Sequence, residues 1–96
     1  MQEISGIKNI YNVINNGING VVIHIYDSIQ NDIDIDIYIE DKFIKIIRAC
    51  YITSISDNIE GKDISIYKVL FTSNSSLISF RIRTPIEYEH KFFVLT

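Results

Sequence analysis

Residues 31–41 read NDIDIDIYIED, an almost unbroken alternation of acidic and apolar side chains. Successive side chains of an extended strand point to opposite faces, so this segment can bury one face and leave the other in water. The pattern therefore predicts a half-buried β-strand over about residues 32–39.

The same alternation predicts how this strand pairs with the segment that follows it. If residues 40–41 form a two-residue hairpin turn, Tyr38 lies opposite Phe43 and Ile37 lies opposite Ile44. The isoleucines of both strands then share one face, whereas a slip of one residue would place isoleucine opposite lysine. Such turns prefer Asn or Gly, and this chain has Glu-Asp there instead.

The rest of the chain divides into a predicted helix and a predicted sheet. Apolar residues recur at spacings of three and four over residues 4–18, which favours an N-terminal helix over about residues 5–16. From Gly20 onward, short apolar runs alternate with polar turns, as is typical of antiparallel strands. We therefore expect an α+β fold in a single domain, residues 1–96, with one N-terminal helix packed on a curved antiparallel sheet of five to six strands. A small β-barrel is the alternative.

Composition supports strands and suggests an origin. The chain contains 23 Ile against three Leu and one Ala, together with eight Asn. Ile is stiff at χ1 and favours strands. Because Ile, Asn and Lys have AT-rich codons, we expect a low-GC source such as a virus, a phage or other mobile element, or an AT-rich bacterium. The single Cys50, the absence of a signal peptide and the lack of a long apolar run favour the cytoplasm, that of the host if the protein is viral, and no membrane partner.

The acidic strand face is the first candidate binding surface. Asp32, Asp34 and Asp36 share one face with Tyr38, and Phe43 lies next to Tyr38 across the turn. This arrangement favours a non-enzymatic binding protein that inhibits or sequesters a host protein, itself basic or nucleic-acid-binding. Alternatively, the aspartates only keep the strand soluble and discourage edge-to-edge aggregation.

A second hypothesis concerns the basic strand near the C-terminus. Arg81, Arg83 and Tyr88 could form a site for a small anionic ligand or nucleotide at the subunit interface of a homo-oligomer. Alternatively, the arginines pair with Glu87 and Glu89 on the next strand. Direct nucleic-acid binding is not expected, because the net charge of the chain is −3.

No segment of the sequence matches a catalytic motif. His24, His90 and Cys50 are the residues that an enzyme would have to use, and the sequence shows no motif that joins them. We expect Cys50 to be a small buried apolar residue in mid-strand. The carboxylates at 32–36 lack the Gly of a calcium loop. We therefore expect no enzymatic activity, no cofactor and no metal.

The segment 42–55 carries apolar residues on both faces of a predicted strand. A strand that is apolar on both sides needs cover on both sides. A single helix covers one face only, so curling of the sheet or a partner subunit must cover the other. We expect a homo-oligomer or an obligate partner.

Overall fold

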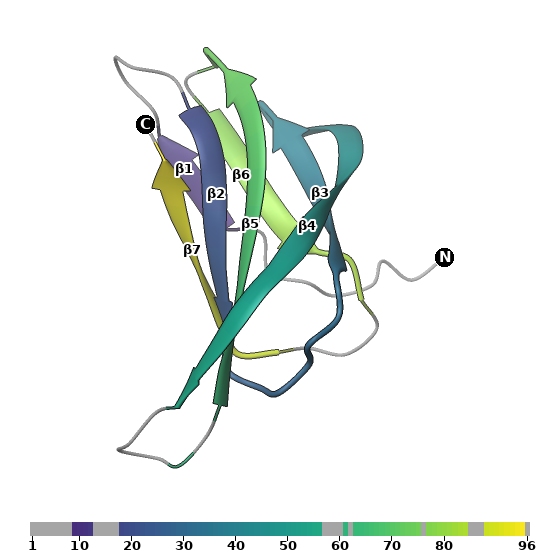
Figure 1. Ribbon diagram of the computed structural model, residues 1–96. Helices are drawn as coiled ribbons and strands as arrows, with labels where there is room; N and C mark the ends of the chain where they lie inside the picture. Colours follow the sequence, from purple (N-terminus) through teal and green to yellow (C-terminus); the bar gives the residue numbers. More distant parts are fainter. Residues whose placement is uncertain are drawn as a thin grey trace.

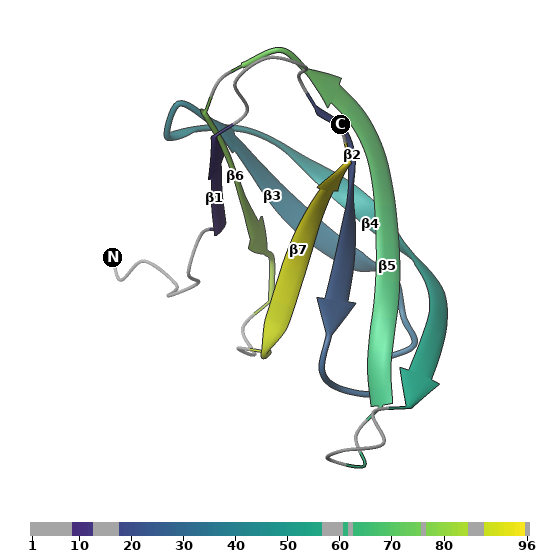
Figure 2. The same ribbon diagram turned by 90° about the vertical axis from the view of Figure 1, so that its left-hand side faces the viewer.

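The computed structural model describes residues 9–12, 18–56, 61, 63–75, 77–84 and 88–95, which are all-β and contain no helix. They form one antiparallel sheet that curls into a half-barrel (Figures 1 and 2). The strand order in this sheet is β1-β6-β3-β4-β5-β2-β7. The strands are β1 (Asn9–Asn12), β2 (Ile18–Ile25), β3 (Ile33–Ile39), β4 (Lys42–Ser56), β5 (Asp63–Ser73), β6 (Leu77–Ile82) and β7 (His90–Leu95).

The expected α+β fold is wrong. Residues 9–12, in the middle of the predicted helix over residues 5–16, form β1 and pair antiparallel with β6. The remainder of that predicted helix lies outside the described residues. Ile and Asn are weak helix formers, and β6 supplies ladder hydrogen bonds, so strand pairing overrides the helical spacing. Ile18, the last residue of the apolar stripe, lies in β2 and is buried in the core.

The antiparallel sheet is confirmed, and its curl comes from the long strand β4. The first part of β4, residues 42–49, pairs with β3, and the second part, residues 50–56, pairs with β5. One strand therefore belongs to both halves of the sheet and bends between them, as Figure 1 shows. The ladders of β4 contain two register shifts, which increase the local twist.

The hydrophobic core fills the inside of the half-barrel. Every strand from β2 to β7 contributes alternate side chains to it. Phe80 lies at its centre and contacts Phe92 and Phe71, with ring centroids 5.6 and 5.7 Å apart. Burying side chains of this size stabilises the fold by about 1.5–3 kcal/mol each. The other buried members are Ile18, Val21, Ile23, Ile25, Ile35, Ile37, Ala49, Tyr67, Val69, Ile78 and Ile82.

Tyr67 is the largest polar-tipped side chain in this core. It is fully buried, and its Oη makes no hydrogen bond of normal geometry with a described residue. Burial raises the pKa of Tyr67 above its ordinary value of 10.0, while the backbone amide of Asn31 opposes part of this rise. The folded state therefore disfavours the phenolate.

Tyr67→Phe is expected to change the free energy of unfolding at neutral pH by less than about 1 kcal/mol. The raised pKa gives stability that is complete below pH 10 and is lost as the pH rises through the folded-state pKa. Urea unfolding at about pH 9 and about pH 11 should therefore show a smaller alkaline loss of stability for Tyr67→Phe than for wild type. Equal alkaline losses in both proteins would contradict this account.

Candidate protein-binding surface

The turn between β3 and β4 has the predicted geometry. Glu40 and Asp41 have positive φ angles of 50° and 65°, as both central residues of a type I′ hairpin turn require. Tyr38 lies opposite Phe43, as predicted, and their rings meet edge-to-face with centroids 5.8 Å apart. The sequence therefore placed this aromatic pair correctly.

Beyond this pair the predicted register is wrong. A register shift follows Tyr38, so Ile37 lies opposite Lys45 rather than Ile44, and Asp36 lies opposite Ile46. Ile44 is the additional residue of a β-bulge. The shift is tolerated because Ile46 and the next residue, Ile47, are both apolar. An apolar side chain therefore faces the core whichever of the two points inward.

The three aspartates of the predicted acidic face have different environments; Asp32 lies just before β3, and the other two lie within it. Asp34 lies directly opposite Arg48, and its Oδ1 is 3.1 Å from the Arg48 Nε in an exposed ion pair. Asp32 Oδ1 accepts a hydrogen bond of 2.9 Å from the backbone amide of Tyr51. Asp36, in contrast, is 0% exposed. The predicted acidic face is therefore not a uniform row of free carboxylates.

Two arginines of β6 hold the Asp36 carboxylate. Arg81 donates to Oδ2 from Nε at 3.1 Å and from Nη2 at 2.8 Å. Arg83 donates to Oδ1 from Nη1 at 3.0 Å. Asp36 lies on the outer face of the sheet but is buried there, between Arg81 on one neighbouring strand and Ile46 on the other. Hydrogen bonds between ionised groups are stronger than those between neutral ones, and here they reach both oxygens of a buried carboxylate.

The sequence did not connect these arginines with Asp36, because they lie 45 and 47 residues away along the chain. The expected pairing of Arg83 or Arg81 with Glu89 does not occur, since β6 and β7 are not neighbours in the sheet. Glu87 lies outside the described residues. Tyr88, the third predicted ligand-binding residue, packs against the hydrophobic core.

Arg81 also connects the ion pairs to the aromatic pair. Its guanidinium carbon lies 5.8 Å from the centre of the Tyr38 ring, within the range of a cation–π contact. We call Asp36, Arg81, Arg83 and Tyr38 the Asp36 cluster. It joins β3 to β6 on the outer face of the sheet and supports Phe43 from one side.

Exposed apolar side chains concentrate on β4. Seven large apolar side chains are exposed among the described residues, and five of them belong to this strand. The inward-facing Ile47, Ala49 and Tyr51 contribute to the core or pack against it, so the strand is apolar on both faces, as its sequence predicted. We call Phe43, Ile44 and Ile46 the β4 apolar stripe; Ile52 and Ile55 extend it along the strand.

Cys50 is exposed, contrary to expectation. Alternation explains this, because the flanking residues 49 and 51 face the core and Cys50 must face outward. It lies opposite Lys68 of β5, and β5 separates it from His24 on β2. His90 contacts the Tyr88 carbonyl through Nδ1 at 2.6 Å. The register therefore places Cys50 and His24 on strands that are not neighbours, which does not favour a nucleophile–base pair.

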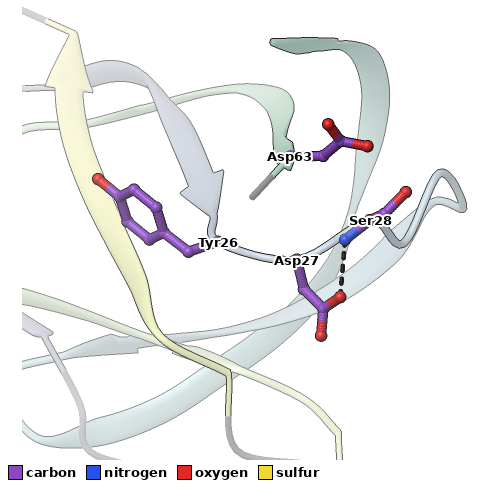
Figure 3. Close-up of a pocket in the computed structure, with 4 residues that line it drawn as sticks. All are labelled: Tyr26, Asp27, Ser28 and Asp63. Atoms are coloured by element: carbon purple, nitrogen blue, oxygen red, sulfur yellow. Dashed lines mark hydrogen bonds between the residues drawn. The ribbon is translucent and has the colours of Figure 1, made fainter. Parts of the chain in front are cut away.

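An open pocket of about 280 Å³ lies where β2 ends, lined by Tyr26, Asp27, Ser28 and Asp63 (Figure 3). The Asp27 carboxylate accepts a hydrogen bond of 2.7 Å from the Ser28 backbone amide. This contact stabilises the turn that leaves β2. Across the described ranges, no group of three or more His, Cys, Asp or Glu side chains is arranged to hold a metal ion.

No family model, no curated protein and no solved structure matches this chain at a significant level. Nor do the residues described here contain a helix of the length and apolarity needed to cross a membrane.

Proposed function

We propose that this chain is a non-enzymatic binding protein that inhibits or sequesters a protein partner through the outer face of the β3–β4 hairpin. The observation that carries the proposal is the β4 apolar stripe, three large side chains that stay exposed next to one another on one strand. Contiguous exposed apolar surface on a folded chain marks an interaction site. Phe43 is the expected anchor, since aromatic residues dominate binding energies at interfaces.

The proposed surface rests on a rigid support. Tyr38, which is 9% exposed, holds Phe43 in an edge-to-face contact, and the Asp36 cluster fixes Tyr38 to β6. A side chain that is already ordered loses less conformational entropy on binding. The function of the Asp36 carboxylate in this proposal is therefore to position the anchor, and it does not itself contact the partner.

The charged residues around the β4 apolar stripe form a rim, which contributes more to the orientation of a bound partner than to its affinity. Asp34 and Arg48 form an exposed pair beside the stripe, and Glu40 and Asp41 carry exposed carboxylates at the turn. Exposed charges at a rim mainly steer association and fix register. Exposed Lys42 and Lys45 lie on the same hairpin, so the rim carries both signs and supports a partner with complementary charges of both signs around an apolar pocket. Because Asp36 binds both arginines of the second hypothesis, the proposal does not extend to an anionic ligand.

The double variant Phe43→Ser/Ile46→Ser is expected to weaken partner binding by roughly thirtyfold or more for each anchor lost. The partner is first captured from lysate with immobilised wild-type protein, then purified and titrated calorimetrically against wild type and variant. Both side chains are about half exposed, at 51% and 45%, so the fold should survive the change.

Leu70→Ser/Phe93→Ser is the matched control, because it removes two exposed apolar side chains from other strands. It should bind the purified partner as wild type does. Equal binding by Phe43→Ser/Ile46→Ser and wild type would overturn the proposed surface. Native mass spectrometry of the free protein shows whether a second copy occupies this face instead.

A further inference from the structure

Strand β7 lies at the edge of the half-barrel, and its ladder with β2 attaches it to the sheet (Figure 2). Its inward-facing Phe92 is buried and stacks on Phe80 of β6, with ring centroids 5.6 Å apart. The stability of the β2–β7 ladder therefore decides whether this part of the core stays covered.

A histidine and a lysine lie directly opposite each other in this ladder. The register pairs His24 of β2 with Lys91 of β7. Both side chains face outward, because the adjacent Ile23 and Phe92 are buried. The His24 ring is only partly exposed and packs against the Phe93 ring, with centroids 4.6 Å apart. A proton on this ring would therefore place two cations at one position of the ladder.

The other charged and titratable groups around His24 come from three strands. On β5, the exposed Lys68 lies diagonally across from it. On β7, the exposed Glu89 lies one outward position beyond Lys91. On β2 itself, the next outward residue is Tyr26, whose ring centre lies 5.9 Å from the Lys91 Nζ. The two lysines disfavour a proton on His24, and Glu89 favours it.

Burial and repulsion outweigh the attraction of Glu89. Burial, and then the Lys91 charge, lower the pKa of His24 below its ordinary value of 6.5. When β7 separates from β2, the ring regains water and Lys91 moves away, so the pKa returns toward 6.5. The neutral ring thus adds stability to the closed ladder that is complete above pH 6.5 and is lost as the pH falls through the lower pKa of the closed state.

We propose that protonation of His24 loosens β7 from β2, which makes this edge of the half-barrel sensitive to mildly acidic pH. Like charges directly opposite each other in a ladder are destabilising. Loosening uncovers Phe92 and the Phe80 ring on which it stacks. In the strand order, β5 and β2 separate β4 from β7, so the loosening is independent of the proposed β3–β4 surface.

Two amides of β7 report on the loosening. The Tyr26 amide donates to the Glu89 carbonyl at 2.9 Å. Alternation along the ladder then turns the Lys91 and Phe93 amides toward β2 as well. Amides of β3 are the internal reference, because that strand has a neighbour on each side.

Native-state amide exchange of the whole protein, followed by NMR, is compared at about pH 7.5 and about pH 5.5, both above the ordinary range of carboxyl pKa values. Protection of the Lys91 and Phe93 amides, relative to intrinsic exchange at each pH, should fall by about threefold or more at the lower pH. Protection of the β3 amides should stay constant. Unchanged protection of Lys91 and Phe93 would overturn the proposal.

Two variants remove the charge pair. His24→Phe keeps a ring beside Phe93 without a titrating group, and Lys91→Met keeps a long side chain without the charge. Acid should change the protection of the Phe93 amide by less than about twofold in His24→Phe, and by less than in wild type in Lys91→Met. His90→Gln is the control, because His90 is the second histidine of the chain and lies on β7 itself. It should respond to acid as wild type does. A response of wild-type size in His24→Phe or Lys91→Met, or none in His90→Gln, would overturn the assignment to His24.

Discussion

Asp36→Ala is expected to lower the free energy of unfolding by about 3 kcal/mol or more. The substitution leaves the guanidinium of Arg81, whose side chain is only 17% exposed, without the carboxylate that it binds through two nitrogens. It also releases Arg83, which is half exposed and can regain water. A domain of this size has a total stability of about 5–15 kcal/mol, so urea unfolding should show a large shift of the midpoint.

Asp34→Ala is the control, since it removes a carboxylate two residues away on the same strand face. Its partner Arg48 is 67% exposed, so the change should cost less than about 1 kcal/mol. Replacing Asp36, Arg81 and Arg83 together with Leu, Met and Met should recover most of the stability lost in Asp36→Ala, because no buried charge then remains. Similar destabilisation by Asp36→Ala and Asp34→Ala would contradict the burial of Asp36.

Glu40→Asn/Asp41→Gly is expected to raise the free energy of unfolding by about 1–2 kcal/mol. Both residues have left-handed backbone conformations, with φ of 50° and 65°, which side chains with a Cβ disfavour. Asn-Gly is the preferred pair for a type I′ turn and should relieve this strain. Urea denaturation at neutral pH measures the gain, and an unchanged m-value would show that the denatured state is unaffected.

Asp41→Ala serves as the opposite control for the turn. Alanine is a poorer residue than Asp in the left-handed region, so this variant should be less stable than wild type. The proposed partner-binding surface begins two residues later at Phe43. If the stabilised turn keeps the Tyr38–Phe43 contact, partner binding should persist in Glu40→Asn/Asp41→Gly. A less stable Asn-Gly variant would contradict the turn assignment.

Part of this fold is set by local patterns. The period-two alternation of residues 32–39 predicts β3, and the next two residues predict the turn, because both depend on neighbours in sequence. The pairing of Tyr38 with Phe43 follows directly from that turn. The apolar residues on both faces of β4 also predict that one face stays exposed, which is the basis of the proposed binding surface.

Local patterns failed where several structures satisfy them equally. The spacing of Ile7, Tyr11 and Ile14 fits a helix, but residues 9–12 pair with β6, a strand about 70 positions away. The bulge at Ile44 interrupts the regular register, and the alternation of the hairpin sequence does not specify it. The exposure of Cys50 was also not predicted. Alternation indicates which residues of β4 share a face with Cys50, but only the curl of the sheet decides which face is inside.

The sequence by itself determined the strands β2 to β7, the turn between β3 and β4, and the alternation of apolar and acidic side chains in β3. Only the tertiary structure decided whether each aspartate is buried or exposed and which side chain it pairs with. Asp34 stays exposed with Arg48, while Asp36 is buried because β6 brings Arg81 and Arg83 to it across 45 and 47 residues. A strand pattern specifies which side chains share a face, but the neighbouring strands determine whether that face meets water, and that choice depends on contacts distant in sequence.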